Sequence, residues 1–201
     1  MNWIEIISAV LGLSCVFLAG RNSKYNFWVG YIYNIFLFCL FAHRHLYSAM
    51  LLQPIAFGIN IYGHWHWTHP SDDEKSAADP NKLKVSRLDT GQWFLLAFII
   101  AAAGALWALA LIALPRKWPS VFVADPSPWL DSYTLMITLL AQLLSALKKW
   151  ECWIIWIVVN VTNIALYLSS GLYLMPLVSL LYLGNGIWSL VSWRKMNKKG
   201  I

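Results

Sequence analysis

The chain has 201 residues, of which 59% are hydrophobic and 12% are charged, and its formal net charge is +6 at pH 7. Soluble domains carry about twice that charged fraction, so water is not the main solvent of this protein. The basic excess requires no nucleic-acid partner, because lysines and arginines lying next to anionic membrane lipid account for it.

Seven stretches of the sequence are apolar and long enough to cross a membrane, which takes roughly 20 residues of helix. They lie near residues 3–20, 26–42, 46–67, 92–114, 130–147, 152–168 and 172–193. The first stretch has no basic leading region, so we expect it to stay in the mature protein rather than to act as a signal peptide. The pattern predicts an all-α integral membrane protein with seven transmembrane helices.

Basic residues are distributed unevenly between the two ends of these helices. One end receives Arg21, Lys24, Lys75, Lys82, Lys84, Arg87, Lys148, Lys149, Arg194, Lys195, Lys198 and Lys199, and the other receives Arg44, Arg116 and Lys117. Because positively charged loops stay in the cytoplasm, we expect an external N-terminus and a cytoplasmic C-terminus.

The sequence contains an internal repeat, since residues 3–69 match residues 129–195 without gaps at an offset of 126. The matched pairs include Trp3 and Trp129, Asn34 and Asn160, Gly58 and Gly184, and Trp67 and Trp193. A three-helix unit ends on the opposite side of the membrane from its start, so a parallel second copy needs one extra crossing. The stretch 92–114, which from Trp93 onward has no Asn, Gln, Asp or His, supplies a lipid-facing connector.

These features divide the chain into six parts. They are a first three-helix repeat (1–69), a cytoplasmic linker (70–91), a connector transmembrane helix (92–114), an external loop (115–128), a second three-helix repeat (129–195) and a cytoplasmic tail (196–201).

Polar and aromatic residues inside the predicted spans fall on narrow helix faces. On the sixth helix Trp153, Trp156, Asn160 and Asn163 lie within an arc of about 80°. The other candidates for the same cavity are Asn34, Gln53, Asn60, Thr138, Gln142, Tyr182 and Asn185. A single Ser, Thr or Asn more often bonds one helix to another, but large groups sharing one stripe favour a cavity.

The side chains of this cavity indicate the kind of ligand. The indoles of Trp153 and Trp156 offer faces for stacking or cation–π contact with an aromatic ring. The amides donate and accept hydrogen bonds, which suits hydroxyl and amide substituents. No Arg or Lys lies inside a span, so the pattern favours a neutral or cationic aromatic metabolite over a phosphorylated one.

Most of the thirteen tryptophans lie near predicted helix ends, where an interfacial belt explains them. This group comprises Trp3, Trp65, Trp67, Trp93, Trp118, Trp129, Trp150 and Trp193. Trp156 lies farther inside its helix and is not explained in this way.

The sequence gives little support for a catalytic or metal-binding function. His64 and His66 are two residues apart and therefore occupy different helix faces, and the three cysteines have no metal-ligand spacing. The sequence contains no nucleophile elbow, zinc-protease motif or phosphate loop. We therefore expect no enzyme activity, no cofactor and no bound metal.

The pattern Trp153-x-x-Trp156-x-x-x-Asn160, followed by Gly171-Leu-Tyr173, resembles the signature of the PnuC family of bacterial vitamin transporters. The segments Leu46-Tyr47 and Asn60-Ile61-Tyr62-Gly63 are also similar to that family. The resemblance implies a SWEET-like fold in the bacterial inner membrane. It also implies uptake of nicotinamide riboside by facilitated diffusion with alternating access.

The resemblance leaves the substrate open, because members of this family are also assigned to thiamine or riboflavin. Trp188 adds to the candidate site, at a position where a riboside carrier is expected to hold an amide. A membrane receptor or scaffold without transport is the alternative from another class. The implied partners are a small vitamin molecule and membrane lipid, and homo-oligomerisation is left open.

Overall fold

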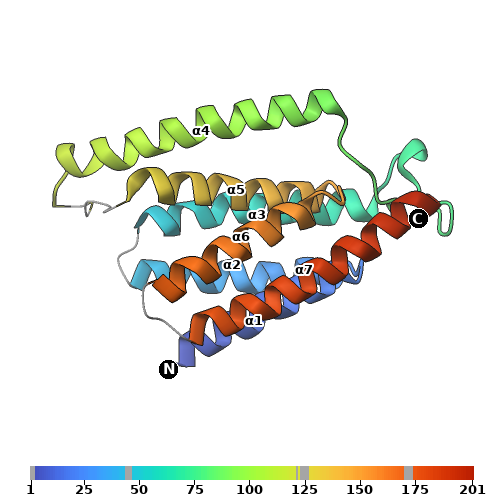
Figure 1. The fold of residues 1–201 in the computed structure, drawn as a ribbon, viewed down its shortest axis with the longest axis horizontal. Helices are drawn as coiled ribbons and strands as arrows, with labels where there is room; N and C mark the ends of the chain where they lie inside the picture. The colour runs from blue at the N-terminus through green and yellow to red at the C-terminus, as the bar shows by residue number, and fades with distance from the viewer. Residues whose placement is uncertain (1–2, 44–46, 121, 123–126, 170–173) are drawn as a thin grey trace. The chain divides into compact units, whose positions relative to one another are not determined.

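The computed structural model describes residues 3–43, 47–120, 122, 127–169 and 174–201. These residues form seven α-helices and one short 3-10 helix (Figure 1). The helices are α1 (Trp3–Gly20), α2 (Tyr25–His43), α3 (Tyr47–Thr68), η1 (Asp72–Glu74), α4 (Thr90–Lys117), α5 (Pro128–Ala146), α6 (Cys152–Ser169) and α7 (Leu174–Lys199). The described residues contain two isolated β-bridges, Lys75 with Leu83 and Ser86 with Lys149, and no β-strand. The predicted all-α fold, with three helices, one connector and three more helices, is confirmed.

Helices α4 and α7 extend furthest beyond the ranges that the sequence predicts, and local chemistry explains where α4 begins and where α7 ends. Helix α4 begins at a capping box, in which the Asp89 side chain accepts the backbone N–H of Gln92 at 2.8 Å and the Gln92 side chain accepts that of Asp89 at 3.1 Å. Helix α7 continues through most of the predicted tail to Lys199. It ends where Gly200 adopts a φ of +68°, a conformation that glycine accepts readily.

The chain forms two compact units, one of residues 1–87 and 141–201 and the other of residues 88–140. In the first unit α2 packs between α1 and α3, α6 packs against α7, and α7 also contacts α1. In the second unit α4 meets the beginning of α5 through small groups. The hydroxyl of Ser132 donates to the carbonyl oxygen of Gly104 at 2.6 Å, and the ring of Tyr133 lies where a side chain on Gly104 would be.

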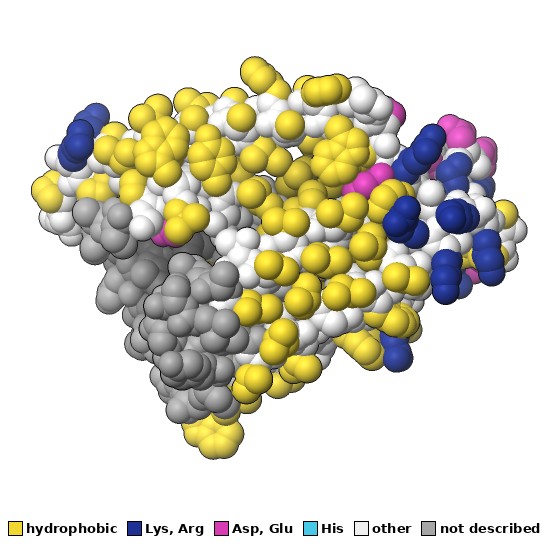
Figure 2. All heavy atoms as spheres, in the orientation of Figure 1, with side chains coloured by type: hydrophobic (Ala, Val, Ile, Leu, Met, Phe, Trp, Pro, Cys, Tyr) yellow, Lys and Arg dark blue, Asp and Glu magenta, His cyan; other side chains and the backbone are white. Residues whose placement is uncertain are grey.

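The outer surfaces of the helices are strongly apolar. On α4 the side chains of Phe94, Phe98 and Leu106 are 70–74% exposed, and large exposed hydrophobic residues also occur on α1, α2, α3 and α7. Figure 2 shows hydrophobic side chains over the helices, with a group of Lys and Arg side chains at the end that carries the C-terminus. Among the described helices α2 and α4 are by themselves long and apolar enough to span a membrane, and α1 and α6 contain shorter apolar stretches.

The two repeats contact each other through matching positions. The indole N–H of Trp67 donates to the carbonyl oxygen of Ala146 at 3.1 Å, and the indole N–H of Trp193 donates to that of Gly20 at 3.1 Å. Trp193 follows Trp67 by 126 residues and Ala146 follows Gly20 by 126 residues, so these are the same contact made twice. The third helix of each repeat is therefore hydrogen-bonded to the end of the first helix of the other repeat.

The positions of these two tryptophans differ from those expected from the sequence. Trp67 and Trp193 were expected in an interfacial belt, but their side chains are 6% and 0% exposed. Their indoles can be buried without losing a hydrogen bond, because each N–H donates to a carbonyl oxygen at a helix end that has no partner within its own helix.

The segment 70–87, predicted as a polar linker, packs onto the basic end of the first unit. Leu83 and Val85 are buried. The backbone N–H of Val85 donates to Ile201 at 2.9 Å, and that of Ser86 donates to Lys148 at 3.1 Å. The segment thus covers the α5–α6 turn and pairs with the last residue of the chain.

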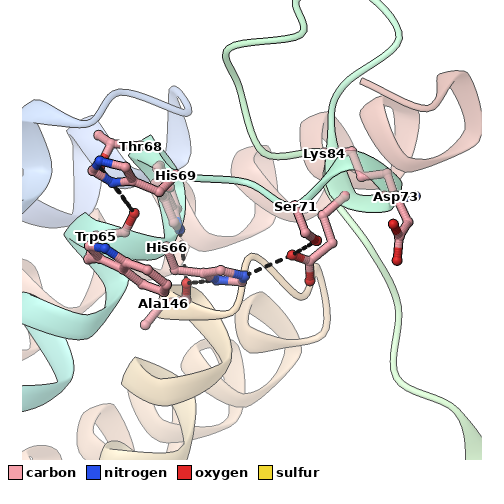
Figure 3. Close-up of polar contacts among 10 residues, drawn as sticks. Trp65, His66, Thr68, His69, Ser71, Asp73, Lys84 and Ala146 are labelled. Atoms are coloured by element: carbon pink, nitrogen blue, oxygen red, sulfur yellow. Dashed lines mark hydrogen bonds and ion pairs between the residues drawn. The ribbon is translucent and has the colours of Figure 1, made fainter.

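His66 links this segment to the helices (Figure 3). Its Nδ1 lies 3.3 Å from the carbonyl oxygen of Ala146, and its Nε2 lies 3.4 Å from the Glu74 carboxylate. Ser71 donates to the same carboxylate at 2.7 Å, and this bond is the main cause that lowers the pKa of Glu74. The carboxylate therefore stays ionised beside His66.

Candidate functional site

Helix α6 presents the tryptophan and asparagine motif to the interior of the first unit. Trp153 is 1% exposed, its ring stands edge-on to Trp193 with centroids 5.5 Å apart, and its indole N–H has no hydrogen-bond partner among the described residues. Trp156, one turn further along, is half-buried. Trp153 therefore belongs to a packed aromatic cluster, and Trp156 is the more accessible indole of the motif.

Two repeat-related asparagines occupy equivalent buried positions on α2 and α6. Asn160 donates from Nδ2 to the carbonyl oxygen of Trp156 at 2.7 Å, a bond within its own helix. Asn34 is 5% exposed, and its Nδ2 has no hydrogen-bond partner among the described residues. A buried donor without a partner costs about 1–3 kcal/mol. Such a group calls for an explanation, and an acceptor on a bound ligand is one.

A third amide, Asn60, packs on α2 at Gly30, which is one turn before Asn34 in the sequence. Asn60 of α3 packs on Gly30 of α2 so closely that a Cβ added to Gly30 would lie 2.7 Å from Nδ2 of Asn60. Gln142 of α5 directs its Nε2 toward Oδ1 of Asn60 at 3.5 Å and toward the carbonyl oxygen of Ala56 at 3.4 Å. Asn60 and Gln142 thus form an amide pair between α3 and α5, and this pair packs on α2 at Gly30.

The repeat is asymmetric at this place. Gly30 matches Trp156 and Asn60 matches Gly186 at the offset of 126 residues, so the first repeat places an amide against a glycine. In the second repeat an indole and a glycine stand at the equivalent positions. At this pair of matching positions the first repeat therefore has an amide and the second repeat has an indole.

The remaining predicted residues make other contacts, and one of them has a side chain outside the described residues. Tyr182 packs against Gly12 of α1, and Asn185 donates to the carbonyl oxygen of Val16 at 3.2 Å. Trp188 is 49% exposed on α7 and lines an open groove with Asn185.

Gln53 is half-buried on α3. Thr138 belongs to the second unit and donates to the backbone carbonyl oxygen of Thr134 in its own helix at 2.8 Å. The side chain of Asn163 lies outside the described residues.

Sequence reasoning missed the glycines that make room for this site. Gly30 receives Asn60, and Gly63 lies against Phe27 and Ala146. The signal that could have revealed Gly30 is its repeat partner, because a glycine that matches a tryptophan marks a place where the two repeats differ in volume.

Comparisons with known proteins identify the family of this chain. Residues 2–195 match the sequence profile of a family described as nicotinamide mononucleotide transporter. The chain belongs to this family. The match confirms the resemblance seen in the α6 motif, and it identifies the protein as a membrane transporter of a vitamin-transport family rather than an enzyme.

Two curated relatives have the same level of identity. The nicotinamide riboside transporter PnuC of Escherichia coli (strain K12) is 27% identical over 199 residues, which cover 88% of this chain and 79% of that protein. The riboflavin/roseoflavin transporter RibM of Streptomyces davaonensis is 27% identical over 191 residues, which cover 95% of this chain and 84% of that protein.

A solved structure has the same fold. The crystal structure of the vitamin B3 transporter PnuC superposes with a TM-score of 0.70 at 23% identity, covering 99% of this chain and 83% of that one. The fold described above is therefore that of a membrane transporter.

Proposed function

We propose that this protein carries nicotinamide riboside across the bacterial inner membrane by facilitated diffusion with alternating access. The observation that carries the proposal is the burial of three asparagines, Asn34 on α2, Asn60 on α3 and Asn160 on α6, of which Asn34 has an Nδ2 without a partner among the described residues. A nucleoside with several hydroxyl groups and a carboxamide supplies the acceptors and donors that these amides need. Trp156 supplies a face for the cationic pyridinium ring.

The charge of the site favours the riboside over the mononucleotide. Helices α2, α3 and α6 contain no Lys or Arg within their bounds, so no fixed cation would neutralise a phosphate group there. The same three helices contain no Asp or Glu. A carrier without a membrane carboxylate near its substrate has no evident group with which to couple transport to a cation, which supports uncoupled diffusion.

Riboflavin is the second candidate, because the relative RibM covers nearly the whole chain at the same identity as the E. coli relative. Thiamine remains a third, since it is also a cationic aromatic molecule and Trp156 does not separate it from a pyridinium. A receptor or scaffold would bind one of these ligands without moving it.

The test is uptake into liposomes that contain the purified protein. Radiolabelled nicotinamide riboside, nicotinamide mononucleotide, riboflavin and thiamine are compared at equal concentration, with protein-free liposomes as the control. The proposal expects saturable uptake of the riboside and none of the mononucleotide. Faster uptake of riboflavin or thiamine would assign that vitamin instead, and binding without uptake would indicate a receptor.

We also propose that the C-terminus is cytoplasmic. The support is the group of Lys and Arg side chains at the C-terminal end of the first unit (Figure 2). A reporter fused after Ile201 should be active only in the cytoplasm, and one inserted near Ser120 only outside. An external C-terminal reporter would refute this orientation.

A further inference from the structure

Helices α1 and α7 lie side by side in the first unit (Figure 1). Their side chains line an open groove of about 580 Å³. Its walls are formed by Leu13, Ser14, Phe17, Arg21, Leu181, Asn185 and Trp188. One polar group of this wall already has a hydrogen-bond partner, because the Asn185 amide donates to the backbone carbonyl oxygen of Val16 at 3.2 Å. The groove is therefore mainly an apolar channel with a cation at one end.

The length of the groove matches one leaflet of a bilayer. Leu13 of α1 and Arg21, just beyond its end, are eight residues apart, which corresponds to roughly 12 Å of helix at 1.5 Å per residue. Half of a typical hydrocarbon core is roughly 15 Å. Arg21 follows the last residue of α1, so the cation stands at the membrane boundary when the apolar walls stand in the hydrocarbon.

The groove opens away from the protein interior. Phe17, Leu181 and Trp188 are all exposed, unlike the buried amides of the candidate transport site. A membrane protein meets lipid on such a face. An indole at the level of the headgroups, as Trp188 would be beside Arg21, is a common arrangement at that boundary.

The charge at the mouth of the groove is positive. The Arg21 guanidinium lies over the Phe17 ring, with Cζ 4.1 Å from the ring centroid. Lys195 lies two turns beyond Trp188 on the same face of α7 and is exposed. Helix α7 contains no acidic residue, and the only acidic residue of α1 is Glu5 at its opposite end. The mouth therefore complements an anionic headgroup.

We propose that the α1–α7 groove binds one anionic phospholipid. Its phosphate contacts Arg21, and one acyl chain lies along Leu13, Phe17 and Leu181. Because α1 is the first helix of one repeat and α7 is the last helix of the other, this lipid bridges the two repeats. The proposal does not depend on which vitamin the protein carries.

Native mass spectrometry of the detergent-solubilised protein tests the headgroup. Phosphatidylglycerol and phosphatidylcholine with identical acyl chains are added at equal concentration. The wild type should retain more phosphatidylglycerol, and Arg21→Gln should reduce this preference about fivefold, the effect of one basic residue near an anionic lipid. Lys24→Gln removes the same charge from the same end, outside the groove, and should keep the preference.

A second pair of variants tests the acyl channel. Leu181→Trp fills the groove and leaves Arg21 in place, so both lipids should be lost. Leu177→Trp, one turn earlier on the exposed face of α7 and outside the groove wall, should retain them. Both positions are exposed, so folding should tolerate the larger side chain.

Three results would overturn the proposal. They are equal retention of the two lipids by the wild type, equal losses in Arg21→Gln and Lys24→Gln, and displacement of the lipid by nicotinamide riboside or riboflavin. The last result would make the groove part of the transport path. Loss of transport in liposomes with lipid retention intact would count against the proposed function alone.

Discussion

Trp67 and Trp193 meet inside the protein with their ring centroids 5.9 Å apart, although 126 residues separate them in the sequence. Each donates its indole N–H to a carbonyl oxygen at the end of the other repeat's first helix. This pair joins the two repeats near the basic end of the first unit, where Lys148 also lies over the Trp67 ring at 4.8 Å.

The first prediction concerns these two N–H groups. Trp67→Phe and Trp193→Phe keep an aromatic ring but remove the donor, which leaves the carbonyl oxygen of Ala146 with His66 alone and that of Gly20 without its indole partner. Each should lower the free energy of unfolding by about 1–3 kcal/mol, measured by thermal or denaturant unfolding in detergent. Trp65→Phe, on an exposed neighbour of Trp67, should change it little. An equal loss in Trp65→Phe would argue against a specific role for the indole N–H.

The second prediction concerns Lys148, which lies in the turn between α5 and α6 with its ammonium group donating to the carbonyl oxygen of Leu83. Burial, and to a smaller extent the charge of Lys82, lowers the pKa of Lys148 from 10.5 to about 7. Between these two values the unfolded chain binds more protons at this position than the folded chain does. Stability should therefore rise with pH from about 7 toward 10.5.

Melting temperatures in detergent at pH 7, 8 and 9 would measure this effect. Lys148→Met should flatten the rise, whereas Lys149→Met, at the neighbouring half-buried lysine, should preserve it. A rise of the same slope in both variants would assign the pH dependence to another group.

The third prediction concerns the α6 motif. If Trp156 stacks on the ring of the substrate, Trp156→Ala should weaken binding more than Trp156→Phe, because Phe keeps part of the aromatic face. Asn160→Leu should weaken binding by about 1–3 kcal/mol, since a polar group of the ligand then loses its partner. Calorimetry with nicotinamide riboside and thiamine would measure both.

The control for this experiment is Trp93→Phe on α4, where the side chain is exposed at the start of the connector helix. Its affinity should equal that of the wild type. Normal binding by both Trp156→Ala and Asn160→Leu would show that this stripe is packing and that the site lies elsewhere.

The fourth prediction separates Asn34 from Asn60. Because the Nδ2 of Asn34 has no partner among the described residues, Asn34→Leu should leave the melting temperature unchanged or raise it while weakening substrate binding. Asn60→Leu should lower the melting temperature, because Gln142 loses a bond and leucine presses on Gly30. A clear loss of stability in Asn34→Leu without a change in affinity would identify that amide as structural.

Much of the fold could be predicted because the membrane imposes long apolar helices. The offset of 126 residues also carries over to the structure, since α1 ends at Gly20 and α5 ends at its match, Ala146. The burial of Trp67 and Trp193 could not be predicted in this way. Hydropathy places a tryptophan at a helix end without showing that a carbonyl oxygen of another helix lies within reach.

The candidate site could be predicted in part. Helical periodicity placed Trp156 and Asn160 on one face, and the repeat paired Asn160 with Asn34. Neither the periodicity nor the repeat shows that Asn185 donates to α1 or that Trp188 lines an outer groove, because these placements depend on how α7 is rotated against α1. Periodicity along one helix contains no information about the direction in which its polar face is turned.

Equilibrium uptake into liposomes, with and without ion gradients, tests the central claim most directly. The account predicts that unmodified nicotinamide riboside enters until its internal and external concentrations are equal. It also predicts that ionophores which dissipate sodium and proton gradients leave this endpoint unchanged. Accumulation above the external concentration that collapses when a gradient is dissipated would contradict facilitated diffusion through this site.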